Sequence, residues 1–230
     1  MSLESLKKQA ALQALTHVED GMLLGLGTGS TARHFIDALG EKVRRGELRN
    51  IRAVSTSKAS EAQAHDYGID IIELRAQTLD LAVDGMDEVD EHLNVIKGLG
   101  GALTREKIVE ACANVFILIG DETKLVSYLG EKQPIPVEVV QFGWQATQKR
   151  LAGLGLEPQR RADGDPFVTD NGNFILHCAT SEARDVYALA NDLAAIPGVV
   201  EHGLFLDMAQ KAYVATQNGV TVLDKAEAKK

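Results

Sequence analysis

The sequence predicts an α/β protein with a Rossmann-like, mostly parallel sheet, helices on both faces, and a smaller ferredoxin-like α+β domain. Short apolar runs alternate with helical patterns over the first 130 residues, which is typical of a parallel sheet covered on both faces. Beyond that point the predicted elements follow the order β-α-β-β-α-β, the split βαβ pattern. Near the end, two alternating runs flank Asn218-Gly219, a strong hairpin signal.

These observations predict two domains. A Rossmann-like catalytic domain comprises residues 1–130 and 208–230, and a ferredoxin-like domain comprises residues 131–207. In this division the C-terminal hairpin returns to the first sheet, so the small domain is an insertion. The sequence leaves open the alternative that the hairpin does not return to the first sheet.

Composition and charge narrow the class of protein. A hydrophobic content of 45% and a charged content of 25% are ordinary for a soluble globular chain. The sequence has no apolar run of membrane length and no signal-peptide pattern, so we expect a cytoplasmic protein with no membrane partner. The net charge of −9 disfavours nucleic acid as a partner. Cys112 and Cys178 lie in apolar runs, which favours buried free thiols over a disulfide.

The first predicted elements lead to an anion site. A helix is predicted from Leu3 to His17 after a serine cap, and the strand MLLGLG follows. The segment GLGTGSTARHFIDAL then predicts a strand, a glycine-rich turn and a helix. At this helix start, free backbone N–H groups and added hydroxyls favour an anion. The residues concerned are Thr28, Gly29, Ser30 and Thr31.

The anion site fits a monophosphate better than a dinucleotide. The dinucleotide pattern G-x-G-x-x-G requires glycine where this chain has Ser30. The acidic residue that would bind the ribose after the next strand is also missing, because IRAVSTSKAS offers hydroxyls and a lysine there. The remaining alternative is that this glycine-rich turn binds no anion and serves only to pack the helix against the strand.

The stretch from Leu79 to Ala111 carries the densest set of reactive side chains. LDLAV predicts a strand that ends at Asp84, the usual place for chemistry in an open α/β sheet. Asp87 follows three residues later, and a second apolar run leads to Lys97 and the glycine-rich loop GLGG. ALTREKIVEACA then predicts a helix with Glu106 in or near its first turn, beside unsatisfied N–H groups.

This set of residue types suits proton transfer on a polar substrate. A carboxylate can act as a base, carboxylic acids can exchange hydroxyl protons, and a cation can stabilise a developing oxyanion. For Asp90 and Glu91, a solvated acidic turn is an equally good interpretation. The spacing is not that of a calcium loop, and no histidine stands at ligand spacing, so we expect no metal.

A further cationic side chain is expected at the end of the next strand. NVFILIGD is a continuous apolar run, and Lys124 stands just beyond it. Ligands of open α/β sheets gather at the carboxyl ends of the strands, where Thr28, Asp84 and Lys124 are all expected.

In the second domain the predicted elements are the strand PIPVEVV, the helix FGWQATQKRLAGLG, the strands LEPQRRA and NFILHCAT, a helix capped by Ser181, and the strand GVVEHGLFL.

Six motifs carry a resemblance to a known family. GLGTGSTA, DGMDEVD, IKGLGGALTREKIV, PVEVV, TDNGN and PGVVEHGLF, in this order and across nearly the whole chain, closely resemble type A ribose-5-phosphate isomerase. The resemblance implies interconversion of ribose 5-phosphate and ribulose 5-phosphate in the non-oxidative pentose phosphate pathway. It also implies no metal or organic cofactor, and a homodimer or a tetramer built from dimers.

The resemblance also implies roles for individual residues. Glu106 resembles the base that moves a proton between C1 and C2 through a cis-enediolate. Asp84 and Asp87 resemble the acids that contact sugar hydroxyls and assist ring opening, and Lys97 resembles the cation that stabilises the enediolate oxygen. The expected ligand contacts are Thr28, Gly29, Ser30, Thr31, Gly98, Leu99, Gly100, Lys124 and Lys7.

Three residues depart from the family pattern. Met86 stands where alanine is usual, Leu99 interrupts a glycine run, and His177 replaces a common aspartate. A leucine at position 99 would be strained if that position required a positive φ. Two other functions fit part of the pattern. One is a sugar-phosphate sensor without turnover, which needs no base, and the other is an amino-sugar phosphate deaminase, which resembles this fold only broadly.

Overall fold

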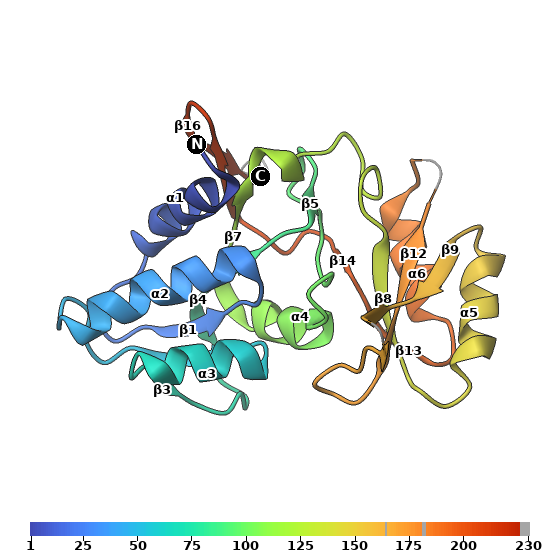
Figure 1. The fold of residues 1–230 in the computed structure, drawn as a ribbon, viewed down its shortest axis with the longest axis horizontal. Helices are drawn as coiled ribbons and strands as arrows, with labels where there is room; N and C mark the ends of the chain where they lie inside the picture. Colours follow the sequence, from blue (N-terminus) through green and yellow to red (C-terminus); the bar gives the residue numbers. More distant parts are fainter. Residues whose placement is uncertain (164, 181–182, 226–230) are drawn as a thin grey trace, which may run out of the picture. The chain divides into compact units, whose positions relative to one another are not determined.

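The structure is a computed structural model that describes residues 1–163, 165–180 and 183–225. The chain forms two compact units, each assembled from separate stretches of sequence (Figure 1). The first unit comprises residues 1–86 and 105–125 and the C-terminal segment from Asp207. The second unit comprises residues 87–104 and 126–206.

A seven-stranded sheet forms the centre of the first unit. Its strands are β1 (Leu23–Leu26), β2 (Arg52–Ser55), β3 (Asp70–Ile71), β4 (Leu79–Gly85), β7 (Ala113–Asp121), β15 (Lys211–Thr216) and β16 (Gly219–Asp224). Their order across the sheet is β16-β15-β7-β4-β1-β2-β3. All neighbouring strands are parallel except β15 and β16, which are antiparallel. The C-terminal hairpin therefore joins the first sheet, as expected.

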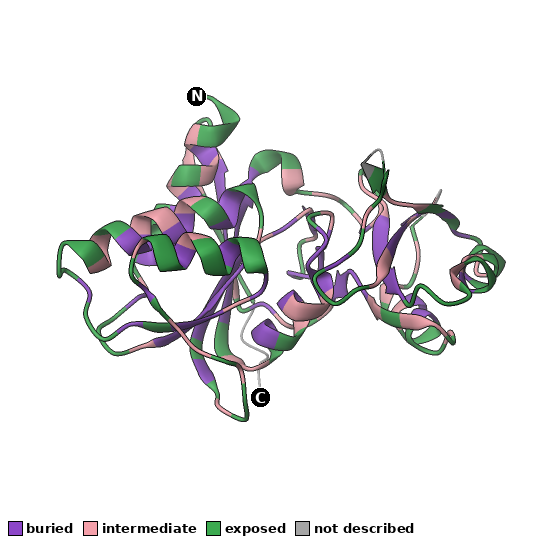
Figure 2. Ribbon diagram, turned by 60° about the horizontal axis from the view of Figure 1, so that its bottom comes forward, coloured by how far each residue is buried: buried purple, intermediate pink, exposed green. Residues whose placement is uncertain are grey.

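Helices cover both faces of this sheet. They are α1 (Leu3–Leu15), α2 (Ser30–Arg44), α3 (Lys58–Asp66) and α4 (Leu103–Ala111). The short 3-10 helix η1 (Glu122–Lys124) follows β7. Successive residues of a strand point to opposite faces. Leu24 of β1 accordingly packs in the cluster that includes Phe35 of α2, whereas Leu23 packs in another with Val109 of α4. Figure 2 shows the buried residues along the strands. The Rossmann-like prediction is confirmed.

The second unit contains a four-stranded antiparallel sheet. Its elements are β8 (Ile135–Val139), α5 (Trp144–Gly153), β9 (Glu157–Arg160), β12 (Phe174–Ala179), α6 (Val186–Ala194) and β13 (Val199–His202). The strand order is β13-β8-β12-β9, so the two central strands are the first and third in the chain. This is the arrangement that the β-α-β-β-α-β order predicts. A two-stranded ribbon of β10 (Ala162–Asp163) and β11 (Asp165–Pro166) lies between β9 and β12 in the chain.

Two predicted elements of the second unit have different bounds. The helix α6 starts later than predicted because Asp185 caps it, accepting hydrogen bonds from the N–H groups of Tyr187 at 3.0 Å and Ala188 at 3.1 Å. Ser181, the predicted cap, lies outside the described residues. The predicted strand GVVEHGLFL breaks at Gly203, where a Cβ would stand 2.3 Å from the Lys97 carbonyl oxygen.

The break at Gly203 leads into a three-stranded sheet, which is not predicted from the sequence. Beyond it, β14 (Leu204–Phe205) pairs with β6 (Val95–Ile96), and β6 pairs with β5 (Glu88–Val89). The strand thus leaves the four-stranded sheet and enters a sheet formed by the segment that follows Asp87.

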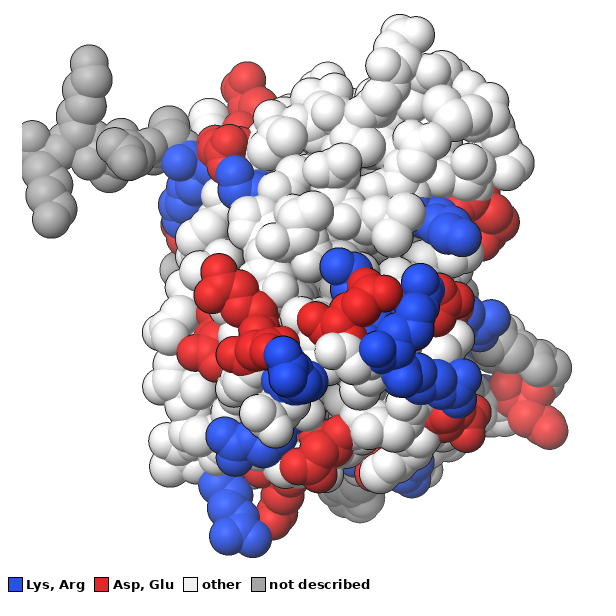
Figure 3. Space-filling model, turned by 90° about the vertical axis from the view of Figure 1, so that its left-hand side faces the viewer, with Lys and Arg blue, Asp and Glu red and all other residues white. Residues whose placement is uncertain are grey.

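The surface carries charges of both signs. On the face of the molecule shown in Figure 3, basic side chains are interspersed with acidic ones. Arg45, for example, lies 2.7 Å from Glu41 and 3.7 Å from Glu47. Among the described residues, no helix combines the length and the apolar character that a membrane crossing demands.

Candidate active site

In the first unit, the ends of β1 and β4 meet through Asp84. The Asp84 side chain is buried, and its Oδ1 accepts hydrogen bonds from the N–H groups of Thr28 at 2.9 Å and Gly85 at 2.6 Å. Gly27 permits this approach because a Cβ there would stand 2.0 Å from Oδ1 of Asp84. The structure thus joins two of the predicted site residues, Thr28 and Asp84, at the carboxyl edge of the sheet.

The Thr28 side chain belongs to a group of hydroxyls. Its Oγ1 lies 2.7 Å from Oγ1 of Thr56, 2.8 Å from Oγ of Ser57 and 3.1 Å from Oγ of Ser60. Ser60 also donates to the Gly27 carbonyl at 2.6 Å, so the turn after β2 supports the turn after β1. Thr28 therefore orders the glycine-rich turn through its side chain. The hydroxyls after β2 are visible in the sequence, but their contact with Thr28 is not.

The turn leads directly into the N-terminus of α2. Gly29 has φ of 115°, a backbone conformation that favours glycine, and it caps the helix without a side chain. Gly29 and Ser30 are exposed, whereas Thr31 is buried and lies beside Gly85. The first N–H groups of a helix lack intrahelical partners and carry a partial positive charge. This end of α2 can therefore bind a phosphate group.

Lys124 lies at the carboxyl end of β7, as predicted. It belongs to η1, which Asp121 caps by accepting a hydrogen bond from the Thr123 N–H at 3.0 Å. A Cβ at Gly120 would stand 2.5 Å from Cε of Met86 and 3.5 Å from Cγ of Lys124. The methionine that departs from the family pattern thus packs onto the backbone beside Lys124.

Lys7 of α1 takes part in an ionic network at the surface. Its Nζ lies 2.7 Å from Oε1 of Glu4, and Oε2 of Glu4 lies 2.9 Å from Nε2 of His34 in α2. The hydrogen bonds from Lys7 and His34 hold the pKa of the Glu4 carboxyl below its ordinary value. The expectation that Lys7 contacts the ligand stays a prediction.

The helix α4 carries two buried carboxylates. Glu106 is its fourth residue and is 2% exposed, and Glu110 follows one turn later with 3% exposed. Residues four apart lie on the same face of a helix. Glu110 is not among the residues predicted for the site, although its spacing from Glu106 is visible in the sequence. A buried carboxylate of this kind can serve as a proton acceptor.

In the second unit, Asp87 and Lys97 stand on neighbouring segments of the three-stranded sheet. The Asp87 N–H donates to the Ile96 carbonyl at 2.8 Å, and the Lys97 N–H donates to the Gly203 carbonyl at 2.9 Å. The Lys97 side chain is buried, with its Nζ 5.6 Å from the centre of the Phe205 ring. Oδ2 of Asp87 accepts a hydrogen bond from the Leu99 N–H at 2.9 Å.

The loop after Lys97 is clamped on both sides of Leu99. Besides the N–H bond to Asp87, the Leu99 carbonyl accepts a hydrogen bond from Nη1 of Arg161 at 2.7 Å. Gly98 and Gly101 have φ of 103° and 93°, whereas Leu99 is not among the residues of positive φ. The strain expected for a leucine of positive φ therefore does not arise.

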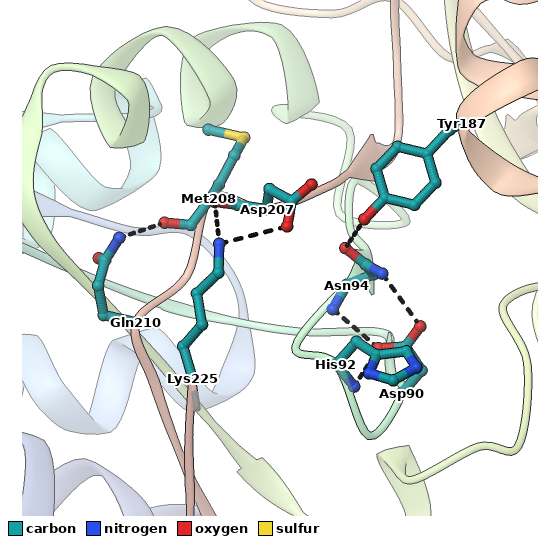
Figure 4. Close-up of polar contacts among 8 residues, drawn as sticks. All are labelled: Asp90, His92, Asn94, Tyr187, Asp207, Met208, Gln210 and Lys225. Carbon is teal, nitrogen blue, oxygen red and sulfur yellow. Dashed lines mark hydrogen bonds and ion pairs between the residues drawn. The ribbon is translucent and has the colours of Figure 1, made fainter. Parts of the chain in front are cut away.

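Asp90 closes a turn, so the interpretation as a solvated loop fits Glu91 alone. Oδ1 of Asp90 accepts hydrogen bonds from the N–H groups of His92 and Asn94, each at 2.9 Å, and the Tyr187 hydroxyl lies 3.5 Å from Oδ1 of Asn94 (Figure 4). Glu91 is exposed. Among the described residues, no group of three or more His, Cys, Asp or Glu could hold a metal ion.

Comparisons with known proteins identify relatives along nearly the whole chain. The family model for ribose 5-phosphate isomerase A (phosphoriboisomerase A) matches residues 52–219. Ribose-5-phosphate isomerase A from Roseiflexus castenholzii is 48% identical over 96% of each chain. The protein of that name from Deinococcus radiodurans is 46% identical over 98% of this chain and 100% of its own.

Solved structures give the same result. A D-ribose-5-phosphate isomerase in complex with phospho-erythronic acid has a TM-score of 0.94 and 44% identity, over 97% of this chain and 100% of its own. Ribose 5-phosphate isomerase from Plasmodium falciparum has a TM-score of 0.94 and 34% identity, over 97% and 99%. The fold, the residues at the strand ends and these matches agree, and the chain belongs to the ribose 5-phosphate isomerase A family.

Proposed function

We propose that this protein interconverts D-ribose 5-phosphate and D-ribulose 5-phosphate with Glu106 as the catalytic base. Membership of the family makes the protein an aldose–ketose isomerase that acts on a sugar phosphate, and the reaction implies a place in the non-oxidative pentose phosphate pathway. The observation that carries the role of Glu106 is its burial in the first turn of α4, within the motif TREKIV.

The proposed chemistry moves one proton between two carbons. In the open-chain aldose, Glu106 takes the proton from C2. The electron pair of the broken C2–H bond forms the C1–C2 double bond, and the carbonyl pair moves onto O1. Glu106 then returns the proton to C1 of the resulting cis-enediolate, and the proton of the O2 hydroxyl moves to the anionic O1, which gives the ketose. A well-placed general base contributes about 10²–10⁴-fold to such a step.

The other site residues assist this transfer in the proposal. Lys97 stabilises the negative oxygen of the enediolate, and Asp84 and Asp87 exchange protons with sugar hydroxyls during ring opening. The phosphate binds to the N-terminus of α2, where its negative charge is favoured. Lys124 and Lys7 add positive charge, and the loop from Gly98 through Leu99 to Gly100 contacts the sugar.

Replacement of the base tests the proposal. Glu106→Gln keeps the shape of the side chain but removes its basicity, so the exchange of the C2 proton with solvent should fall at least about 10²-fold. Proton NMR in D₂O with ribose 5-phosphate and a chelator measures the exchange, and circular dichroism verifies the fold. Glu41→Gln, on the exposed side of α2, is the control. Near-normal exchange by Glu106→Gln would exclude the role assigned to Glu106.

Two alternative functions are separated by the same assay. A sugar-phosphate sensor would bind ribose 5-phosphate but leave it unchanged. An amino-sugar phosphate deaminase would release ammonia from an amino-sugar phosphate, and that substrate would compete with ribose 5-phosphate. Turnover of ribose 5-phosphate by the wild-type chain excludes the sensor. Turnover that an amino-sugar phosphate does not inhibit excludes the deaminase.

The division of the chain into domains is a further proposal, and so are the oligomeric state and the cellular location. We propose that residues 1–130 and 208–230 form the catalytic domain and that residues 131–207 form the ferredoxin-like domain, which limited proteolysis can test.

The resemblance supports a homodimer or a tetramer built from dimers, which analytical ultracentrifugation measures. It also supports action in the cytoplasm, and fractionation of the source cells would contradict this if the protein were found in an organelle.

A further inference from the structure

A buried carboxylate in β8 has no part in the proposed chemistry. Glu138 is 1% exposed and accepts hydrogen bonds from four side chains. Its Oε1 accepts from Oγ1 of Thr169 at 2.9 Å, from Nδ2 of Asn173 at 2.8 Å and from Nδ2 of Asn171 at 3.5 Å. Its Oε2 accepts from Oγ1 of Thr104 at 2.5 Å. One carboxylate therefore holds two segments that lie more than thirty residues away from it in the chain.

The support behind Glu138 is rigid. β8 is a central strand, paired with β12 on one side and β13 on the other, and Glu138 stands opposite Ile175 and Glu201. The turn on its Oε1 side is closed by two hydrogen bonds of its own. The Thr169 N–H donates to the Asn173 carbonyl at 2.9 Å, and the Asn173 N–H donates to Oγ1 of Thr169 at 3.1 Å.

The other oxygen of Glu138 holds the start of α4. Thr104 is the second residue of that helix, and Glu106 follows two residues later in the same turn. The first turn is the part of a helix that its own hydrogen bonds restrain least, because its N–H groups have no intrahelical partners. An anchor at Thr104 therefore sets the position of the turn that carries Glu106.

We propose that Glu138 is a positioning residue for the catalytic base and that it acts through the Thr104 hydroxyl. The inference rests on the proposed role of Glu106. A general base works only when its oxygen lies within hydrogen-bond reach of the proton that it takes. A displacement of about 1 Å at such a centre can lower the rate about 10²-fold.

Replacement of Thr104 tests the link without disturbing the rest of the network. Thr104→Val keeps the shape of the side chain and leaves the bonds of Glu138 to Thr169 and Asn173 in place. We expect kcat for ribose 5-phosphate to fall about 10–100-fold and KM to change less than about threefold, because substrate binding does not depend on the base. Thr104→Ser restores the hydroxyl and should restore kcat.

A matched substitution separates positioning from general loss of structure. Thr147 of α5 is also buried in the second unit, and its hydroxyl donates to the Pro197 carbonyl at 3.2 Å. Thr147→Val should therefore leave kcat unchanged at a temperature where both variants are folded by circular dichroism. Unchanged kcat in Thr104→Val, or no recovery in Thr104→Ser, would refute the inference.

A double variant tests whether the effect passes through Glu106. In Glu106→Asp the base is already displaced by about the length of one methylene group, so adding Thr104→Val should cost less than about threefold more in kcat. Losses that simply multiply would show that Thr104 acts independently of the base and would overturn the proposal. Failure of the wild-type chain to turn over ribose 5-phosphate, or full activity in Glu106→Gln, would instead refute the proposed function.

Discussion

The Asp84 carboxylate accepts a hydrogen bond from the backbone N–H of Thr28 at 2.9 Å, and this bond joins the ends of two neighbouring parallel strands. Because Gly27 has no side chain, the carboxylate can lie against the backbone of the glycine-rich turn. The turn that is expected to bind phosphate therefore also fixes the place of an acid that is expected to act on the sugar.

This relationship makes Gly27 a sensitive position. A Cβ there would stand 2.0 Å from Oδ1 of Asp84, so Gly27→Ala must displace the carboxylate, the turn or both. We expect kcat/KM for ribose 5-phosphate to fall about 10²-fold, the scale of a 1 Å misplacement at a catalytic site. Steady-state kinetics measures the loss. Wild-type kinetics in Gly27→Ala would mean that the placement of Asp84 does not matter for turnover.

The matched control is the same substitution where space is free. A Cβ at Gly153, the last residue of α5, would meet no atom within 4 Å. Gly153→Ala should leave the kinetics unchanged and raise the free energy of unfolding by at most about 1 kcal/mol, since alanine favours the helix. Urea unfolding measures that difference.

Arg161 should affect binding through the loop at Leu99. Its guanidinium donates to the Leu99 carbonyl and lies 3.8 Å from the centre of the Phe167 ring. Arg161→Met keeps much of the side-chain length but removes the donor, so the loop loses one of its two clamps. We expect KM for ribose 5-phosphate to rise about three- to tenfold, as the loss of one hydrogen bond to a charged donor implies.

The adjacent arginine provides the control for that experiment. Arg160 packs over the rings of Trp144 and Phe174, at 4.6 Å and 5.2 Å from their centres, rather than against the loop. Arg160→Met should leave KM near the wild-type value. An equal rise of KM in both variants would attribute the effect to charge in general rather than to the clamp at Leu99.

The two cysteines should differ in reactivity. Burial raises the pKa of the Cys178 thiol from 9.0 to about 12, whereas Cys112 is only partly buried. Iodoacetamide at pH 8 should modify Cys112 alone in the folded protein and both thiols in denaturant, as mass spectrometry of the peptides reports. Labelling of folded Cys178 at the rate of Cys112 would contradict this burial.

The same thiol gives stability a dependence on alkaline pH. The folded state holds the Cys178 proton more tightly than the unfolded state, because its pKa is the higher of the two. The contribution of this thiol is therefore complete below pH 9 and declines as the pH rises from 9 towards 12. Cys178→Ala should flatten the decline of urea stability over this range, compared with Cys112→Ala as the control.

Glu88 should be important for stability rather than for chemistry. It is fully buried and accepts hydrogen bonds from the N–H groups of Gly130, Lys132 and Gln133, each at 2.6 Å. Glu88→Gln replaces one acceptor oxygen with an NH₂ group that faces these donors. We expect the free energy of unfolding to fall by about 2–4 kcal/mol, the cost of unsatisfied buried donors. Exposed Glu91→Gln should change it by less than about 0.5 kcal/mol.

Local patterns were sufficient to predict where the reactive residues stand on the sheet. Thr28, Asp84 and Lys124 lie at the carboxyl ends of β1, β4 and β7 because strand and helix alternate along the chain, and this alternation is visible in the sequence. The order β-α-β-β-α-β likewise predicted the four-stranded sheet of the second unit.

Contacts between distant segments could not be predicted in this way. PVEVV predicts a strand, but nothing in it reveals that Glu138 binds Thr104 and Thr169, which lie 34 and 31 residues away. The glycine run around Leu99 raises the question of strain there, yet the leucine that has a positive φ is Leu93, with φ of 62°. That conformation belongs to the local turn that Asp90 closes through the N–H groups of His92 and Asn94.

The position of β15 in the first sheet has a consequence for synthesis. β7 pairs with β4 on one side, and its other neighbour, β15, begins only at Lys211. While the ribosome makes the intervening residues, the apolar edge of β7 has no strand beside it, which exposes the nascent chain to faulty pairing with other chains. Completion of the sheet must therefore wait until β15 and β16 leave the exit tunnel.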